Sequence, residues 1–187
     1  MLKWTVALLV SAGLCTALDH QHVVWGVLAY PHPELWQQAW WVPLLFFVAT
    51  LAALAAADPL RRLVGSEPAP PPGLALAVVD AASFAAAYYL TAVAHHEPDA
   101  LTAILGGTWL LRAMAGLPGW AVAYCIGAAL IGPAVESTLS AVGGFHYLHP
   151  DFLGVARWLP ALYLHVGVVA VSVAGLLRAR QPVDIDV

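Results

Sequence analysis

Six apolar segments, separated by short polar breaks, dominate the sequence. They cover residues 4–18, 36–57, 74–94, 100–114, 120–142 and 159–177. A helix needs about 20 apolar residues to cross the hydrocarbon core of a bilayer, and most of these segments approach that length. Together they hold more apolar side chains than one soluble core of this size could bury. The sequence therefore predicts an all-α, polytopic membrane protein built as a six-transmembrane-helix bundle.

Composition agrees with this fold class. Of the 187 residues, 61% are hydrophobic and only 10% are charged, whereas soluble domains average about 25% charged residues. The scattered basic residues give no sign of a nucleic-acid-binding surface. Cys15 and Cys125 both lie within apolar segments, which argues against a disulfide framework. No internal repeat is evident, and we expect a single domain over residues 1–187.

The basic residues predict the orientation of the bundle, because lysine and arginine mark cytoplasmic loops. With the N-terminus inside, only Arg157 falls outside. The basic residues then on the cytoplasmic side are Lys3, Arg61, Arg62, Arg112, Arg178 and Arg180. The run that follows Lys3 also fits a removable signal peptide, but five further spans favour a first span. We therefore expect both termini in the cytoplasm.

This orientation places most histidines outside the cytoplasm: His20, His22, His32, His95, His96, His146 and His149. One interpretation is a metal centre built from His20 and His22, or from His95, His96 and Asp99. The other is that polar residues gather where helices end, and we favour it because neither group has a recognised ligand spacing. A pH-responsive surface stays open. His165 lies inside a span, where we expect a hydrogen-bonded core residue.

Two acids, Asp80 and Glu136, fall within predicted spans. An ionisable group at membrane depth costs at least about 2.5 kcal/mol and usually faces a partner or a cavity. Neither acid has an evident basic partner in a span, so one interpretation is a protonated acid bonded to nearby hydroxyl groups. The other is a polar spot in a lipid-accessible cavity, with Pro133 opening the fifth span as its wall. Trp109 could line that cavity, although packing explains it equally well.

The stretch 145–160 places charges between apolar spans. Pro150 should stop the preceding helix, and Asp151 is positioned to cap a short helix that runs toward Trp158. Phe152 lies among these charges and should dip into the membrane interface. We therefore expect an ordered cap over the outer face of the bundle.

Three stretches together resemble the Insig family: Ala-Trp-Trp-Val-Pro at 39–43, the loop Asp-Pro-Leu-Arg-Arg-Leu-Val-Gly-Ser-Glu-Pro at 58–68, and Tyr-Leu-His-Pro-Asp-Phe-Leu-Gly-Val-Ala-Arg-Trp-Leu-Pro at 147–160. The resemblance covers nearly the whole chain, with six spans in matching order. It implies a non-enzymatic regulator of cholesterol homeostasis that binds oxysterols and holds sterol-sensing-domain partners such as Scap and HMG-CoA reductase. The resemblance also implies a location in the endoplasmic reticulum for a eukaryotic protein, whereas we expect the plasma membrane for a bacterial one. The family's Pro-Asp-Phe motif, associated with partner binding, is matched here by Asp151 and Phe152.

These arguments lead to one preferred function and one alternative. The preferred function is a lipid sensor that holds a sterol or diacylglycerol-like neutral lipid in an intramembrane cavity, without cofactor or metal, and with a homo-oligomer left open. The expected lipid-binding residues are Asp80, Ser83, Trp109, Glu136, Ser137 and Thr138. The alternative is a membrane-embedded sterol or lipid enzyme that uses Asp80 and Glu136 as acid and base, with the histidines as metal ligands.

Overall fold

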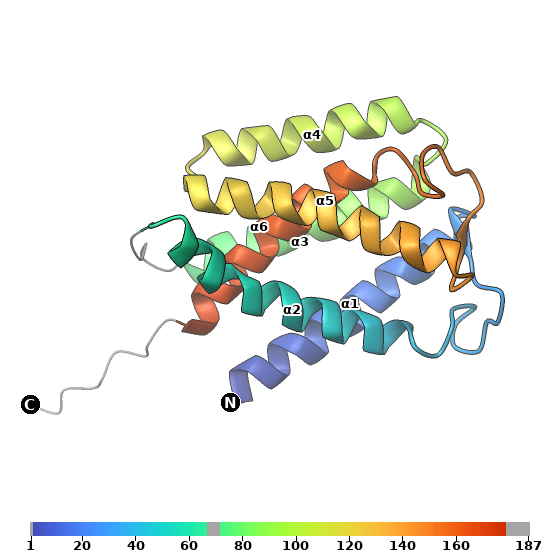
Figure 1. Cartoon of the computed structure of the whole chain (residues 1–187), viewed down its shortest axis with the longest axis horizontal. Helices are drawn as coiled ribbons and strands as arrows, with labels where there is room; N and C mark the ends of the chain where they lie inside the picture. The colour runs from blue at the N-terminus through green and yellow to red at the C-terminus, as the bar shows by residue number, and fades with distance from the viewer. Residues whose placement is uncertain (1, 67–71, 179–187) are drawn as a thin grey trace, which may run out of the picture.

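The computed structural model describes residues 2–66 and 72–178. These residues form helices α1 (Leu2–Val24), α2 (Val42–Leu63), α3 (Leu74–Val93), α4 (Pro98–Met114), α5 (Gly119–Ala141) and α6 (Leu159–Arg178), and short strands β1 (Leu28–Ala29) and β2 (His146–Tyr147). The helices lie roughly side by side as a bundle (Figure 1). The predicted all-α, six-helix fold is confirmed. All except α4, which has 17 residues, are long and apolar enough to cross a membrane.

Two predicted helix boundaries were wrong. The first helix was expected to end at residue 18 and continues to Val24, whereas the second was expected from residue 36 and begins at Val42. Trp36 and Gln37 have positive φ angles of 49° and 60°, which a helix cannot accommodate. The three tryptophans of residues 36–41 therefore lie in the turn region before α2 and not in a helix.

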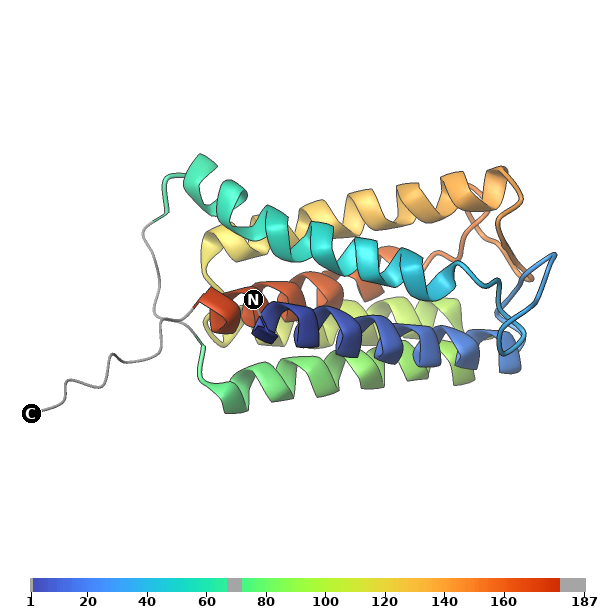
Figure 2. The same cartoon turned by 90° about the horizontal axis from the view of Figure 1, so that it is seen from below.

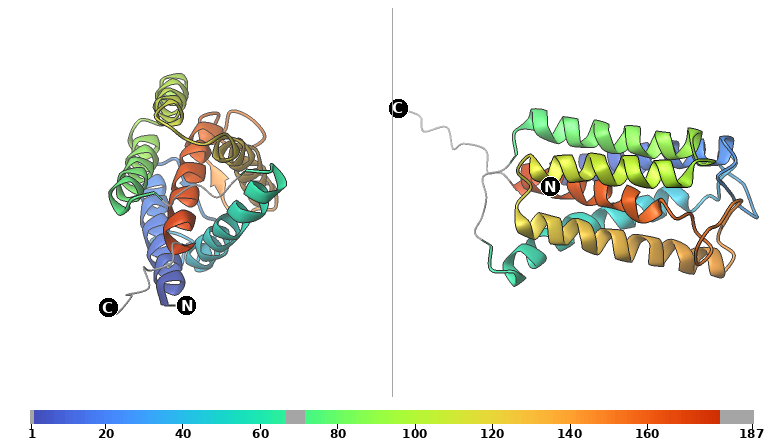
Figure 3. Two further views of the ribbon diagram at one scale, coloured as in Figure 1. Left: turned by 90° about the vertical axis from the view of Figure 1, so that its left-hand side faces the viewer. Right: turned by 90° about the horizontal axis from the view of Figure 1, so that it is seen from above.

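Helix α6 forms the centre of the bundle and packs against α2, α3, α4 and α5 (Figure 3). Half of the residues in the most apolar stretch of α6 are buried, compared with 17% in the corresponding stretches of α2 and α5. Large apolar side chains therefore remain exposed on the outer helices, for example Leu51 on α2 and Leu130 on α5. A surface of this kind suits contact with lipid chains, because these residues would be costly in water.

The bundle has two chemically different ends (Figure 2). The terminal end carries the start of α1, the end of α2, the start of α3, the α4–α5 turn and the end of α6, and the loop end carries β1, β2 and the α3–α4 turn. Of the described basic residues, Arg157 lies at the loop end. The others lie at the terminal end: Lys3, Arg61, Arg62, Arg112 and Arg178. Arg180 lies outside the described residues.

The two long connections at the loop end are copies of one sequence motif. The connection from α1 to α2 and the connection from α5 to α6 match at a constant spacing of 117 positions, from 26 and 143 to 43 and 160. The matched pairs are Gly26 and Gly143, Tyr30 and Tyr147, His32 and His149, Pro33 and Pro150, Glu34 and Asp151, Ala39 and Ala156, Trp41 and Trp158, and Pro43 and Pro160. The expectation of no internal repeat was wrong.

The two copies share backbone geometry as well as residue types. In each copy an acidic side chain accepts a hydrogen bond from the backbone N–H six residues later, Trp40 N–H to Glu34 and Arg157 N–H to Asp151. Positive φ angles recur at matched positions, Trp36 with Leu153 and Gln37 with Gly154. Strands β1 and β2 pair antiparallel and place Ala29 opposite its matched residue, His146. The two connections are therefore related by a local twofold axis through this pair.

Candidate functional site

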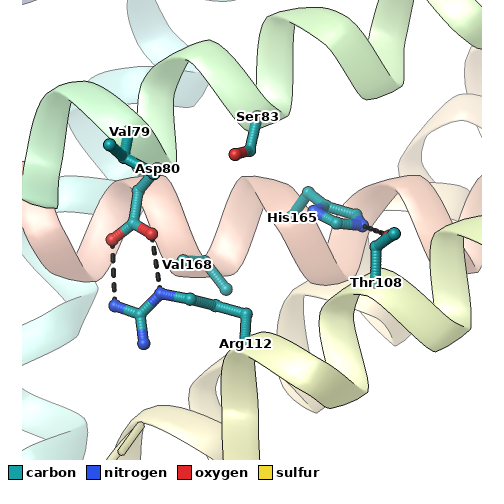
Figure 4. A pocket seen from close by; sticks show the side chains of 7 residues that line it. All are labelled: Val79, Asp80, Ser83, Thr108, Arg112, His165 and Val168. Atoms are coloured by element: carbon teal, nitrogen blue, oxygen red, sulfur yellow. Dashed lines mark hydrogen bonds and ion pairs between the residues drawn. The ribbon is translucent and has the colours of Figure 1, made fainter. Parts of the chain in front are cut away.

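A polar pocket of about 90 Å³ lies between α3, α4 and α6. Figure 4 shows the side chains that line it: Val79, Asp80, Ser83, Thr108, Arg112, His165 and Val168. Asp80 and Ser83 were both predicted as site residues, and the structure brings them together here. Their spacing of three residues puts both on one face of α3.

Asp80 is bound on both carboxylate oxygens. The Arg112 side chain donates from Nε to Oδ1 at 2.7 Å and from Nη2 to Oδ2 at 3.1 Å, and Ser172 Oγ donates to Oδ2 at 2.5 Å. Asp80 is 3% exposed. The expectation that Asp80 lacks a basic partner was wrong, because Arg112 lies in the last turn of α4 and reaches back to α3. A buried charge with a bidentate partner and a further donor is well satisfied.

The rest of the pocket offers neutral hydrogen-bonding groups. His165 Nε2 lies 3.0 Å from the Leu105 carbonyl oxygen and 3.4 Å from Thr108 Oγ1, so His165 is the hydrogen-bonded core residue that was expected. Ser83 Oγ makes no hydrogen bond with another described residue, and its side chain points into the pocket (Figure 4). The Ser83 hydroxyl is therefore available to a ligand.

The other predicted lipid-binding residues lie elsewhere. Glu136, on α5, accepts hydrogen bonds from Tyr147 Oη at 2.6 Å and from Tyr163 Oη at 2.7 Å. Ser137 Oγ donates to the Leu153 carbonyl and Thr138 Oγ1 to that of Ala134, so neither hydroxyl serves Glu136. The Glu136 partners are thus tyrosines.

No residue of α5 lines the pocket between α3, α4 and α6. Helix α5 continues through Pro133, and the expectation that α5 walls a lipid-accessible cavity beside Glu136 stays a prediction. Trp109 is partly buried on α4 and also lies outside the pocket lining.

Asp80 and Glu136 do not form one acid–base site. Helices α3 and α5 both start at the terminal end, and Asp80 lies six residues into α3 whereas Glu136 lies 17 residues into α5. At 1.5 Å per residue, the two acids differ in depth by roughly 15 Å. A general acid and a general base must both reach one substrate group. Their separation removes the support for the predicted acid–base pair.

A second buried polar group, which the sequence analysis missed, lies beneath the loop end. Asp19 is 5% exposed and accepts hydrogen bonds from Tyr30 Oη at 2.7 Å and Gln38 Nε2 at 2.6 Å. His22 is 2% exposed, lies 2.9 Å from Thr91 Oγ1 and stacks on Tyr88. Asp19 and His22 were expected at an exposed helix end.

One signal could have revealed this group. Leu8, Ala12, Thr16 and Asp19 lie at helical spacing and are buried along one side of α1, so the inward face continues past residue 18. The repeat adds a second signal, because Asp19 and Glu136 are also 117 positions apart and each accepts a bond from the matched tyrosine. The two acids thus hold matched structural roles.

Asp151 caps a tight turn, and the predicted short helix toward Trp158 is absent from the described residues 151–158. Its carboxylate accepts the Arg157 backbone N–H at 3.0 Å and the Arg157 Nη2–H at 2.9 Å. These bonds lower the pKa of Asp151 below its ordinary value of 3.8. Leu153 and Gly154 have positive φ angles, which explains why the turn replaces a helix.

These features define a multi-pass helical membrane protein with a polar pocket among its helices. No family model matches the sequence. The INSIG protein homolog of Mycolicibacterium vanbaalenii is 36% identical over 177 residues, which cover 88% of this chain and 81% of the homologue. The chain belongs to the Insig family, and the predicted resemblance is confirmed.

Solved structures give the same result. The crystal structure of MvINS, a mycobacterial Insig homologue from Mycobacterium vanbaalenii, superimposes with a TM-score of 0.79 at 31% identity and covers 97% of both chains. A cross-linked, cysteine-substituted MvINS trimer gives a TM-score of 0.81 at 32% identity, again over 97% of both chains. The fold prediction is thus confirmed across nearly the entire chain.

Proposed function

We propose that this protein is a non-enzymatic membrane regulator that binds a neutral lipid by its polar head, in the pocket between α3, α4 and α6. The observation that carries the proposal is a polar pocket at membrane depth with an available hydroxyl, Ser83 Oγ. The ligand class is a sterol, as the Insig resemblance implies, or a diacylglycerol-like lipid, because a neutral lipid with a hydroxyl group suits a site with few hydrogen-bonding groups.

The size of the pocket limits which part of the ligand enters it. A volume of about 90 Å³ corresponds to roughly three water molecules, whereas pockets for drug-sized ligands measure about 300–1,000 Å³. Only a head group fits. Val79 is 56% exposed, and Ser83 and Thr108 are also exposed, so the pocket reaches the lipid-facing surface. The apolar part of the ligand then lies against the outside of α3 and α4.

The charge balance of the pocket favours a neutral head group. Arg112 is neutralised by Asp80, so the pocket has no uncompensated cation for an anionic phosphate. The guanidinium still has N–H groups that Asp80 does not use. A lipid hydroxyl or ester carbonyl can accept one of them, and a lipid hydroxyl can also bond to Ser83. Asp80 then acts on the ligand mainly by holding Arg112.

We further propose a topology and two kinds of partner. The basic terminal end faces the cytoplasm, and the loop end faces the opposite side. The MvINS trimer supports a homo-oligomer. Phe152 and Leu153 are 67% and 68% exposed beside Asp151, and they supply an apolar surface for a partner such as a sterol-sensing-domain protein.

Two leucine substitutions on the same helix test the lipid site. Ser83→Leu fills the pocket, whereas Ala82→Leu adds the same bulk at an exposed position that does not line it. Lipid that copurifies with each protein in mild detergent is extracted and quantified by mass spectrometry. We expect one lipid class near one copy per chain in the wild type and in Ala82→Leu, and at least a tenfold loss in Ser83→Leu. Equal lipid in both variants, or no specific lipid in the wild type, would refute the proposal.

A further inference from the structure

Three histidines from two separate loops meet at the loop end. His95 and His96 lie in the α3–α4 turn, and His149 lies in the connection between β2 and α6. One nitrogen of each ring lies within 4.8 Å of a nitrogen on each of the others. The rings of His95 and His149 are nearly parallel, with their centroids 6.1 Å apart. The chain thus assembles a three-imidazole cluster that no helical spacing in the sequence could indicate.

The hydrogen bonding of the cluster leaves ring nitrogens free to bind a metal. His95 Nδ1 lies 2.8 Å from the Ala92 carbonyl oxygen, an acceptor only, so Nδ1 carries the proton and Nε2 keeps its lone pair. A carbonyl that fixes the tautomer in this way is the usual support of a metal-binding histidine. His96 and His149 make no hydrogen bond with another described residue.

An exposed ion pair links the two loops beside the cluster. Arg157, eight residues after His149, contacts Asp99 in the first turn of α4 at 2.8 Å and Asp151 at 2.9 Å. Asp99, which the sequence analysis considered as a ligand, is thus engaged by Arg157. The bridge links the α3–α4 turn to the connection that carries His149, although an exposed ion pair of this kind contributes little to holding the three imidazoles close.

We propose that His95, His96 and His149 bind a divalent transition metal of the zinc type. Neutral imidazole suits zinc, copper, nickel and iron, and suits calcium and magnesium poorly. Zn–N bonds of about 2.0–2.1 Å require ligand nitrogens roughly 3.4 Å apart in a tetrahedral site. His96 and His149 are exposed, so small rotations of their rings can close the remaining distance. The three histidines leave a fourth position for water or a carboxylate.

The internal repeat supplies a matched control. His32 is the counterpart of His149 in the first connection and is also exposed. Among the described residues, no group of three histidine, cysteine or acidic ligands includes His32. His32→Ala therefore removes the same side chain from the same kind of loop without touching the cluster.

The test measures zinc binding to protein that carries no histidine tag, in detergent, after treatment with a chelator. Metal content after equilibration and gel filtration, together with a zinc titration by calorimetry, is measured for the wild type, His149→Ala and His32→Ala. We expect one zinc per chain in the wild type and His32→Ala, and at least a tenfold weaker affinity in His149→Ala. Zinc at about 100 times its Kd should raise the melting midpoint of the wild type by roughly 5–10 °C.

Three results would overturn the assignment. They are no stoichiometric zinc in the wild type, equal affinity in His149→Ala and the wild type, and magnesium binding as tightly as zinc. A variant with all three histidines replaced by alanine covers binding elsewhere, because zinc retained by that variant places the ion outside the cluster. Circular dichroism of each variant separates a loss of ligand from a loss of fold.

Discussion

Gly167, on α6, is a position where an added side-chain carbon would meet the backbone of a neighbouring helix. A Cβ at this position would lie 2.6 Å from Cys125 Cα and 2.8 Å from Cys125 Sγ. Non-bonded carbons normally lie about 3.5–4.0 Å apart, so Gly167→Ala must separate α5 from α6 by about 1 Å. These two helices form the largest helix–helix contact of the protein, which makes the separation expensive.

The expected magnitude follows from two opposed effects. Forcing one methyl group into a packed interface costs about 1–3 kcal/mol, whereas replacing glycine by alanine in a helix gains up to about 1 kcal/mol. We expect Gly167→Ala to lower the free energy of unfolding by about 1–2 kcal/mol. Gly127, on α5, is the control, because a Cβ there meets nothing within 4 Å. Gly127→Ala should keep or slightly raise stability.

Both variants are compared with the wild type by denaturant titration in one detergent and at one protein concentration, because an oligomer would make stability depend on concentration. The double variant Cys125→Ala with Gly167→Ala adds a second check. It removes the sulfur but keeps the Cα that lies closest, so it should recover little stability. The reasoning fails if Gly167→Ala is as stable as Gly127→Ala, or if the double variant returns to wild-type stability.

Three further predictions concern charged groups. The pKa of Asp151 is lowered in the folded protein, so the stabilisation by this carboxylate is present above the unfolded pKa, near 3.8, and is lost as pH falls through the lower folded value. The melting midpoint of Asp151→Asn should therefore fall less steeply below pH 4 than that of the wild type. Asp99→Asn is the control and should follow the wild type, because the Asp99 side chain is 84% exposed. Asp80→Asn leaves a guanidinium unpaired inside the bundle and should cost about 2–3 kcal/mol in denaturant titration; unchanged stability would show that the pair contributes nothing. A cysteine introduced near Arg61 should react with a membrane-impermeant reagent only from the cytoplasm, and one near His146 only from the opposite side; labelling of both from one side contradicts the proposed topology.

The fold could be predicted from the sequence because long apolar segments leave few alternatives in a membrane. The structure of the loop end could not be predicted in this way. Residues 36–41 include three tryptophans, which were read as the start of a span, yet the backbone at Trp36 and Gln37 turns with positive φ, and residue type at these positions carries no information about φ. The buried positions of Asp19 and His22 followed from extending the face of α1, but polar residue type argued for exposure. The packing of the helices therefore buried polar residues that their residue type alone predicted to be exposed.

The pairing of Asp80 with Arg112 could have been predicted. The α3–α4 turn is centred near His96, and each of the two residues lies 16 positions from it. Antiparallel neighbouring helices bring such positions to the same depth. Arg112 lies within the predicted span 100–114 but was counted only as a residue of the cytoplasmic side, which hid this relation. His149, by contrast, meets His95 only because the β1–β2 pairing sets the height of the second connection, and no pattern within one segment encodes that contact.

The repeat explains why both proposed sites use the same helices. Helices α1 and α2 correspond to α5 and α6, but α3 and α4 have no counterpart, and both pack against α6 without comparable contact with α2. Each pseudo-symmetric position therefore meets a different environment. Among the described residues, His149 belongs to a group of three histidines and His32 belongs to no such group. Residues of α6 line the pocket beside Asp80 and Arg112, and no described residue of α2 lines it. Two similar helical hairpins form the scaffold. The unrepeated pair α3–α4 packs against one of them and supplies most of the polar side chains of both proposed sites. Substitutions that loosen α4 from α6 should on this argument weaken lipid retention and zinc binding together, whereas equivalent changes between α1 and α2 should reduce stability alone.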